Sequence, residues 1–147
     1  KLYATKARTT RMTRMNRTIA LRTVVVSALS AAMPQGSKVY YQQAQDDHPK
    51  IYAVYTVELV DNTDERFAYE VEVNLMDYGK NTATIEDLAD TVHDALDKKV
   101  VINQDIGVHF YADRRNAVEE EDRNILRRRL TFSAYLSPRR IWPSLLK

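Results

Sequence analysis

Residues 51–76 read IYAVYTVELVDNTDERFAYEVEVNLM, and this stretch decides the fold. Two runs rich in β-branched and aromatic residues, 51–60 and 67–76, flank the turn-forming segment 61–65, which predicts a β-hairpin. In the second run the apolar residues Tyr69, Val71 and Val73 alternate with polar ones. A strand with this pattern buries one face and leaves the other in water, which is typical of an antiparallel sheet covered on one side.

Further elements follow on both sides of the hairpin. The apolar spacing predicts a helix over residues 16–32, with Asn16 as N-cap, and a second helix over 84–98, with Thr84 and Asp87 as a capping box. Short strands are expected at 38–42 and 108–112, and a longer strand at 125–136. We interpret residues 113–124 as a highly charged connection.

The expected order of elements is α-β-β-β-α-β-β. It predicts an α+β fold, an antiparallel-dominated sheet of about five strands with two helices packed on one face. The 147 residues suit one domain, and no apolar run approaches the about 20 residues that span a bilayer. We therefore expect no membrane partner.

Enzyme chemistry has little support in the sequence. The chain contains no cysteine, so thiol nucleophiles, thiolate metal ligands and disulfides are excluded. His48, His93 and His109 show no metal-ligand spacing, and the three glycines lie too far apart to cradle a phosphate. We predict a protein that is not an enzyme, with no cofactor and no metal.

Charge divides the chain into three parts. Residues 1–18 hold six of the 22 basic residues and residues 138–147 hold three, which leaves 13 basic residues against all 20 acidic ones in the body. We interpret residues 1–14 as a flexible basic arm, 15–137 as a single domain and 138–147 as a basic tail. Basic ends beside an acidic body suit contacts with another acidic surface, such as a second copy.

The run Arg127-Arg128-Arg129 has two interpretations. Arg127 and Arg129 share the outward face of the last strand and could bind phosphates of a nucleic acid. Alternatively, they pair across strands with Glu70 and Glu72, which also face outward. The matching alternation and the abundance of acids favour the second interpretation.

Most of the chain, from about Met15 to Leu136, resembles the tail terminator, or tail-completion, family of long-tailed phages (siphophages). The order and spacing of several segments carry the resemblance, after an N-terminal helix: Lys38-Val39-Tyr40, Pro49-Lys50-Ile51-Tyr52-Ala53-Val54-Tyr55, Phe67–Tyr78, the helix Ile85–Leu96 and the Arg-rich segment Glu119–Leu136. The arm and the tail after Pro138 are outside the resemblance.

The resemblance implies a structural role in the tail or neck of a virion, for a protein made in the host cytoplasm. Such proteins form a ring, usually a homohexamer, at the head-proximal end of the tail tube; the ring stops tube polymerisation and joins the tail to the head connector. The implied partners are further copies of the chain, the tail tube protein and the connector or stopper protein, while genome DNA passes through the lumen without specific binding. Two alternatives stay open, another neck or tail-tube component, and a nucleic-acid-binding module that uses the arm and Arg127–Arg129.

A head-to-tail ring needs two different complementary patches on each subunit. We expect the basic residues Arg114 and Arg115 of one copy to meet the acidic end of the same connection in the next copy. The alternative is that the connection is a solvated hairpin tip with no partner. The candidate subunit-interface residues are Arg8, Arg11, Arg14, Arg114, Arg115, Glu119, Glu120, Glu121 and Asp122.

Overall fold

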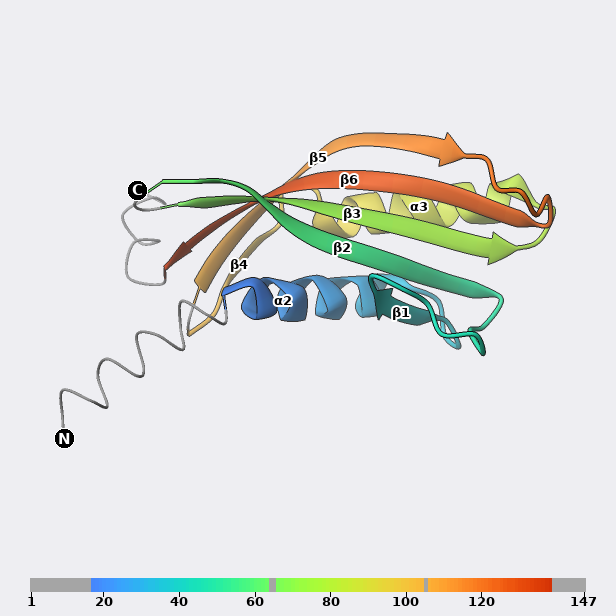
Figure 1. Ribbon diagram of the computed structural model, residues 1–147, viewed down its shortest axis with the longest axis horizontal. Helices are drawn as coiled ribbons and strands as arrows, with labels where there is room; N and C mark the ends of the chain where they lie inside the picture. Colours follow the sequence, from blue (N-terminus) through green and yellow to red (C-terminus); the bar gives the residue numbers. More distant parts are fainter. Residues whose placement is uncertain (1–16, 64–65, 105, 139–147) are drawn as a thin grey trace.

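The computed structural model describes residues 17–63, 66–104 and 106–138 of the chain (Figure 1). Within these residues, two helices and six strands follow one another in the order α-βββ-α-βββ. Their bounds are α2 (Arg17–Ala32), β1 (Lys38–Tyr41), β2 (Ile51–Asn62), β3 (Phe67–Tyr78), α3 (Thr82–Leu96), β4 (Val100–Ile102), β5 (Ile106–Val118) and β6 (Ile125–Pro138).

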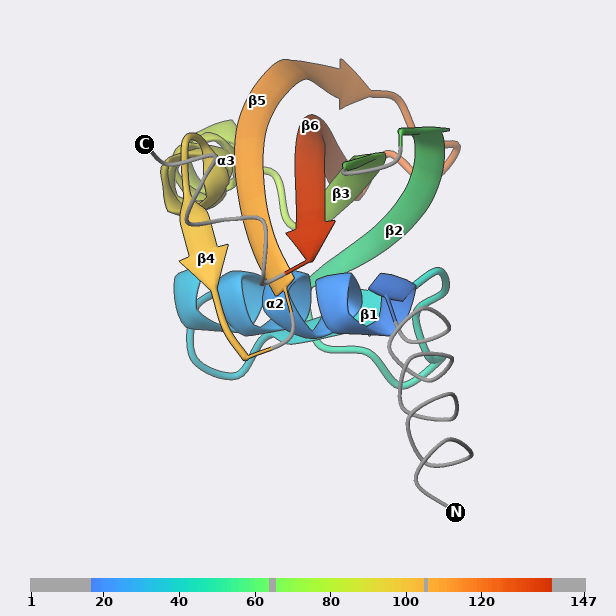
Figure 2. The ribbon, with the colours of Figure 1, turned by 90° about the vertical axis from the view of Figure 1, so that its left-hand side faces the viewer.

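All six strands belong to one curled sheet, in the order β1-β2-β3-β6-β5-β4 (Figures 1 and 2). Among the described strands, only the β1–β2 pair is parallel, and the other four pairs are antiparallel. The predicted α+β fold with an antiparallel-dominated sheet is therefore confirmed. The sheet has one strand more than the expected five, because the three-residue β4 is too short to show a pattern of its own.

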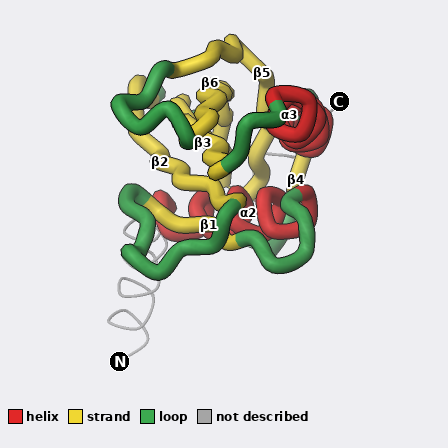
Figure 3. The backbone as a smooth tube through the Cα atoms, turned by 90° about the vertical axis from the view of Figure 1, so that its right-hand side faces the viewer, coloured by secondary structure: helices red, strands yellow, loops and turns green. Residues whose placement is uncertain are grey.

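The core lies between the sheet and the two helices. Val71 and Val73 of β3 lie opposite Phe132 and Leu130 of β6, and all four side chains are buried. The predicted alternation in these two strands is therefore confirmed. Helix α2 adds Leu21, Val24, Val25, Ala28 and Leu29 to the core, and α3 adds Ile85, Leu88, Ala89, Val92 and Leu96. In the end-on view of Figure 3, α2 lies below the curled strands, beside β1, and α3 lies beside β5.

Helix α3 begins earlier than predicted. Asn81 is the N-cap, and its side-chain oxygen accepts a hydrogen bond from the backbone N–H of Ala83 at 3.0 Å. The predicted capping box of Thr84 and Asp87 is wrong, because Thr84 already lies inside the first turn. The helix ends at Leu96, before the predicted Lys98, which adopts a left-handed backbone with φ of 61°. The predicted N-cap of α2, Asn16, lies outside the described residues.

The predicted connection 113–124 is wrong in its first half, because β5 continues to Val118. A β-bulge interrupts the β5–β6 ladder, where Ala112 pairs with Phe132, Arg114 pairs with Thr131 and Asp113 is left out of the register. One extra residue shifts the alternation by one position. The bulge therefore turns Arg115, opposite the buried Leu130, toward the helix side of the sheet. Ion pairs with neighbouring elements stabilise this charged half of β5. The sequence of β5 alone does not reveal these partners, so this half of the strand was not predicted.

Candidate assembly surfaces

The face of the sheet opposite the helices carries a series of charged pairs. Arg129 lies 3.8 Å from Glu72, and Arg114 lies 3.9 Å from Glu70. The cross-strand interpretation of Arg129 is therefore confirmed for its contact with Glu72. Glu70, in contrast, is paired with a residue of β5.

Arg127 has partners other than the predicted ones. Its Nε donates a hydrogen bond to Asn74 Oδ1 at 2.9 Å, and its Nη1 lies 2.8 Å from Glu120 Oε1. The side chains of Arg127 and Glu120 are 24% and 29% exposed, so this pair is partly shielded from water. Since each outward guanidinium of the run is already paired with a carboxylate, the run does not form a free phosphate-binding patch.

Arg128 and Arg115 belong to a second cluster on the helix side of the sheet. Arg128 contacts Glu86 of α3, and Arg115 lies 2.7 Å from Glu86 and 2.6 Å from Asp90. The hydrogen bond from Arg128, supported by the one from Arg115, holds the pKa of Glu86 below its usual value. The hydrogen bond to Asp90 is the largest contribution that raises the pKa of Arg115. The cluster ties β5 and β6 to the first half of α3.

The predicted interface residues therefore fall into three groups. Arg8, Arg11 and Arg14 lie outside the described residues, as do residues 139–147 of the tail. Arg115 and Glu120 hold their own chain together through the pairs given above. The exposed members of the set are Arg114, Glu119, Glu121 and Asp122.

The three histidines contact aromatic or acidic neighbours. The His48 ring lies 4.0 Å from that of Tyr52, the His109 ring lies 4.3 Å from that of Tyr111, and His93 lies 3.2 Å from Asp94. Within the described part of the chain, no group of three or more His, Cys, Asp or Glu side chains could hold a metal ion. In that same part, no helix combines the length and the apolar character needed to cross a membrane.

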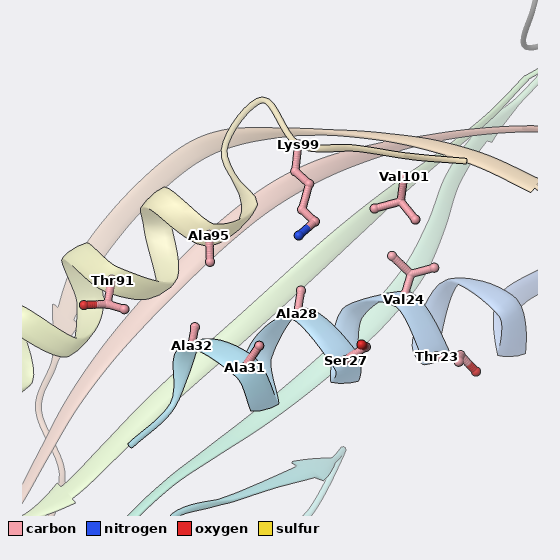
Figure 4. Close-up of a pocket in the computed structure, with 10 residues that line it drawn as sticks. All are labelled: Thr23, Val24, Ser27, Ala28, Ala31, Ala32, Thr91, Ala95, Lys99 and Val101. Atoms are coloured by element: carbon pink, nitrogen blue, oxygen red, sulfur yellow. The ribbon is translucent and has the colours of Figure 1, made fainter. Parts of the chain in front are cut away.

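A groove between α2, α3 and β4 is a surface that the sequence analysis missed (Figure 4). It measures about 530 Å³, and small or apolar side chains form most of its walls, among them Val24, Ala28, Ala95 and Val101. Lys99 projects into the groove from the segment between α3 and β4. The short side chains of Ser27, Ala28, Ser30, Ala31 and Ala32 in α2 are the sequence signal for this groove, because short side chains leave space between two helices.

The end of the hairpin where β2 stops and β3 begins is a second apolar surface that the sequence analysis missed. Leu59 and Val60 are 42% and 57% exposed, although both lie in β2. The ladder shifts register between Leu59 and Asp61, so a bulge lies at this end of the hairpin. Bulges re-aim side chains, which explains how two consecutive apolar residues are both exposed.

Comparison with known proteins shows likeness in structure only. No protein-family model matches the chain, and no curated protein matches it. Among 23 matching chains of solved structures is a chain from the virion of a native gene transfer agent (GTA) particle. The likeness covers 74% of this chain and 84% of that one, with a TM-score of 0.57 and 19% sequence identity. At this identity the likeness establishes a shared fold.

Proposed function

We propose that this chain is a structural protein of a phage-like virion, and within it a tail terminator. The observation that carries the proposal is the fold shared with a virion chain of a gene transfer agent particle over 84% of that chain. The segments that resemble the tail terminator family support it independently, since they coincide with β1, β2, β3, α3 and β6. In this role the chain binds no cofactor and catalyses no reaction.

The proposed assembly is a ring, a homohexamer at the head-proximal end of the tail tube. Its neighbours are the tail tube protein on one side and the connector or stopper protein on the other, and genome DNA passes through the lumen. Carboxylates repel phosphates, so the acidic excess of residues 19–137 suits a channel that DNA crosses without binding.

Two contacts between subunits follow from the charges. The exposed Arg114 of one copy meets the exposed Glu119, Glu121 and Asp122 of the next copy. The basic residues Arg8, Arg11 and Arg14 of the N-terminal arm meet the acidic body of a neighbour. Arg115 is left out of this pairing, because it is already bound to Glu86 and Asp90.

Measurement of the mass in solution, with and without tail tubes, tests the proposal. We expect a ring, visible by electron microscopy, and tail tubes of limited length in its presence. The Arg114→Glu substitution should weaken the ring, and added salt should weaken the wild-type ring in parallel. Lys98→Glu, which reverses an exposed charge just beyond the end of α3, is the matched control.

Two results would contradict the proposal. A chain that stays monomeric and leaves tube growth unchanged is not a terminator. Tight binding to DNA that weakens steeply with salt would instead support a nucleic-acid-binding module.

A further inference from the structure

Two surfaces of the described chain have matching properties and no partner within it. Strand β2 ends and β3 begins at one end of the sheet (Figure 1). There the hairpin presents the exposed apolar pair Leu59 and Val60, followed by the exposed acid Asp61. On the helix side, the groove presents an apolar floor. Exposed pairs of large apolar side chains mark contact sites more often than isolated ones do.

The groove also has a cation at its edge. Lys99 is exposed and forms no ion pair with any described residue, and Figure 4 shows its side chain directed across the gap toward α2. An ammonium group above an apolar floor suits a segment that carries apolar side chains beside a carboxylate. The hairpin end has this composition.

The hairpin end is held away from the groove of its own chain. Tyr69, the ladder partner of Leu59, shares a hydrogen bond of 3.0 Å with Thr18 near the start of α2. The Arg17 guanidinium lies 3.5 Å from the centre of the Phe67 ring, which anchors β3 at the same end. Since β2 and β3 are paired along their length, the hairpin end cannot fold back into the groove.

We propose that the hairpin end of one copy docks into the α2–α3 groove of the next copy. Leu59 and Val60 lie on the apolar floor, and Asp61 pairs with Lys99. Because the two surfaces differ, the contact is head-to-tail, and repetition of such a contact about an axis closes a ring. The inference rests on the proposed function, and it names the surfaces by which ring subunits hold each other.

The absence of native cysteines allows a direct test by disulfide cross-linking. Val60→Cys places a thiol on the hairpin end, and Ala31→Cys places one on the exposed wall of the groove. The two single variants are mixed and mildly oxidised at a concentration where the wild-type protein is assembled. Tyr111→Cys, an exposed position on β5, replaces Ala31→Cys in the matched control.

We expect a covalent dimer to form in the first mixture and not in the control mixture. Equal yields in both mixtures, or an equal yield from Val60→Cys alone, would overturn the inference. A ring that forms normally without the cross-link overturns the hairpin contact and leaves the tail terminator proposal intact. A chain that never assembles and yields no dimer overturns both.

A charge exchange provides a second measurement that does not depend on thiol geometry. Lys99→Glu should weaken self-association, and Asp61→Lys on the same chain should restore it, since each interface then contains one opposite-charge pair again. If the double variant associates as weakly as Lys99→Glu alone, the two residues are not in contact between subunits.

Discussion

Arg115 of β5 donates a hydrogen bond from Nη2 to Oε2 of Glu86 on α3 at 2.7 Å, across 29 residues of sequence. It reaches this carboxylate because the bulge at Asp113 turns its side chain to the helix side of the sheet. The neighbouring Arg114 stays on the opposite face and lies 3.9 Å from Glu70. Two consecutive arginines therefore have different roles, which leads to the first prediction.

Arg115→Ala should lower the free energy of unfolding by about 1 to 2 kcal/mol, because it removes two short charged contacts at a side chain that is largely shielded. Urea-induced unfolding measures the change. Arg114→Ala is the matched control and should change the stability by less than about 0.5 kcal/mol, since that side chain is 69% exposed. Equal losses for both variants would show that the bulge does not separate their roles.

The stability contributed by Glu86 should depend on pH. Hydrogen bonds from Arg128 and Arg115 lower its pKa in the folded state. A lowered pKa means that the contribution is fully present above the pKa of an unfolded Glu, about 4.3, and is lost as the pH falls through the folded value. The unfolding free energies of the wild type and Glu86→Gln should therefore differ by a constant amount from about pH 7 to pH 5 and converge below about pH 4. Glu121→Gln, which removes a carboxylate at an exposed loop position, is the control variant.

The observed start of α3 leads to different predictions for substitutions of Asn81 and Thr84. Asn81→Ala removes the cap bond to the Ala83 N–H and should lower the free energy of unfolding by about 1 kcal/mol. Thr84→Ala should leave it unchanged or raise it slightly, since alanine has the higher helix propensity. Thermal unfolding of the two variants decides the matter, and a larger loss for Thr84→Ala would place the cap where the sequence analysis first expected it.

Phe132 lies fully buried at the centre of the sheet, opposite Val71. Phe132→Ala should lower the free energy of unfolding by about 3 to 5 kcal/mol, because it removes a large apolar side chain and leaves a cavity. Leu59→Ala, at an exposed apolar position, should cost less than about 0.5 kcal/mol in the monomer. A small loss for Phe132→Ala would mean that the core between sheet and helices does not hold the fold together.

Much of the fold is determined by local sequence pattern. Helix α2, the β2–β3 hairpin and β6 were predicted close to their observed bounds, because each buries one continuous face and its apolar residues recur with the period of a helix or a strand. The same alternation placed Glu72 and Arg129 on one face, and they do pair there.

The tertiary structure alone decided the rest. Strand β4 has three residues and exists because β5 offers it a partner, and the second half of β5 is polar and depends on ion pairs with β3 and α3. The α2–α3 groove likewise arises from elements distant in sequence, and the exposed hairpin end depends on a bulge in the β2–β3 ladder. Local periodicity reports which face of an element is buried, but charge pairing, bulges and grooves depend on which elements become neighbours, and that is settled only when the chain folds.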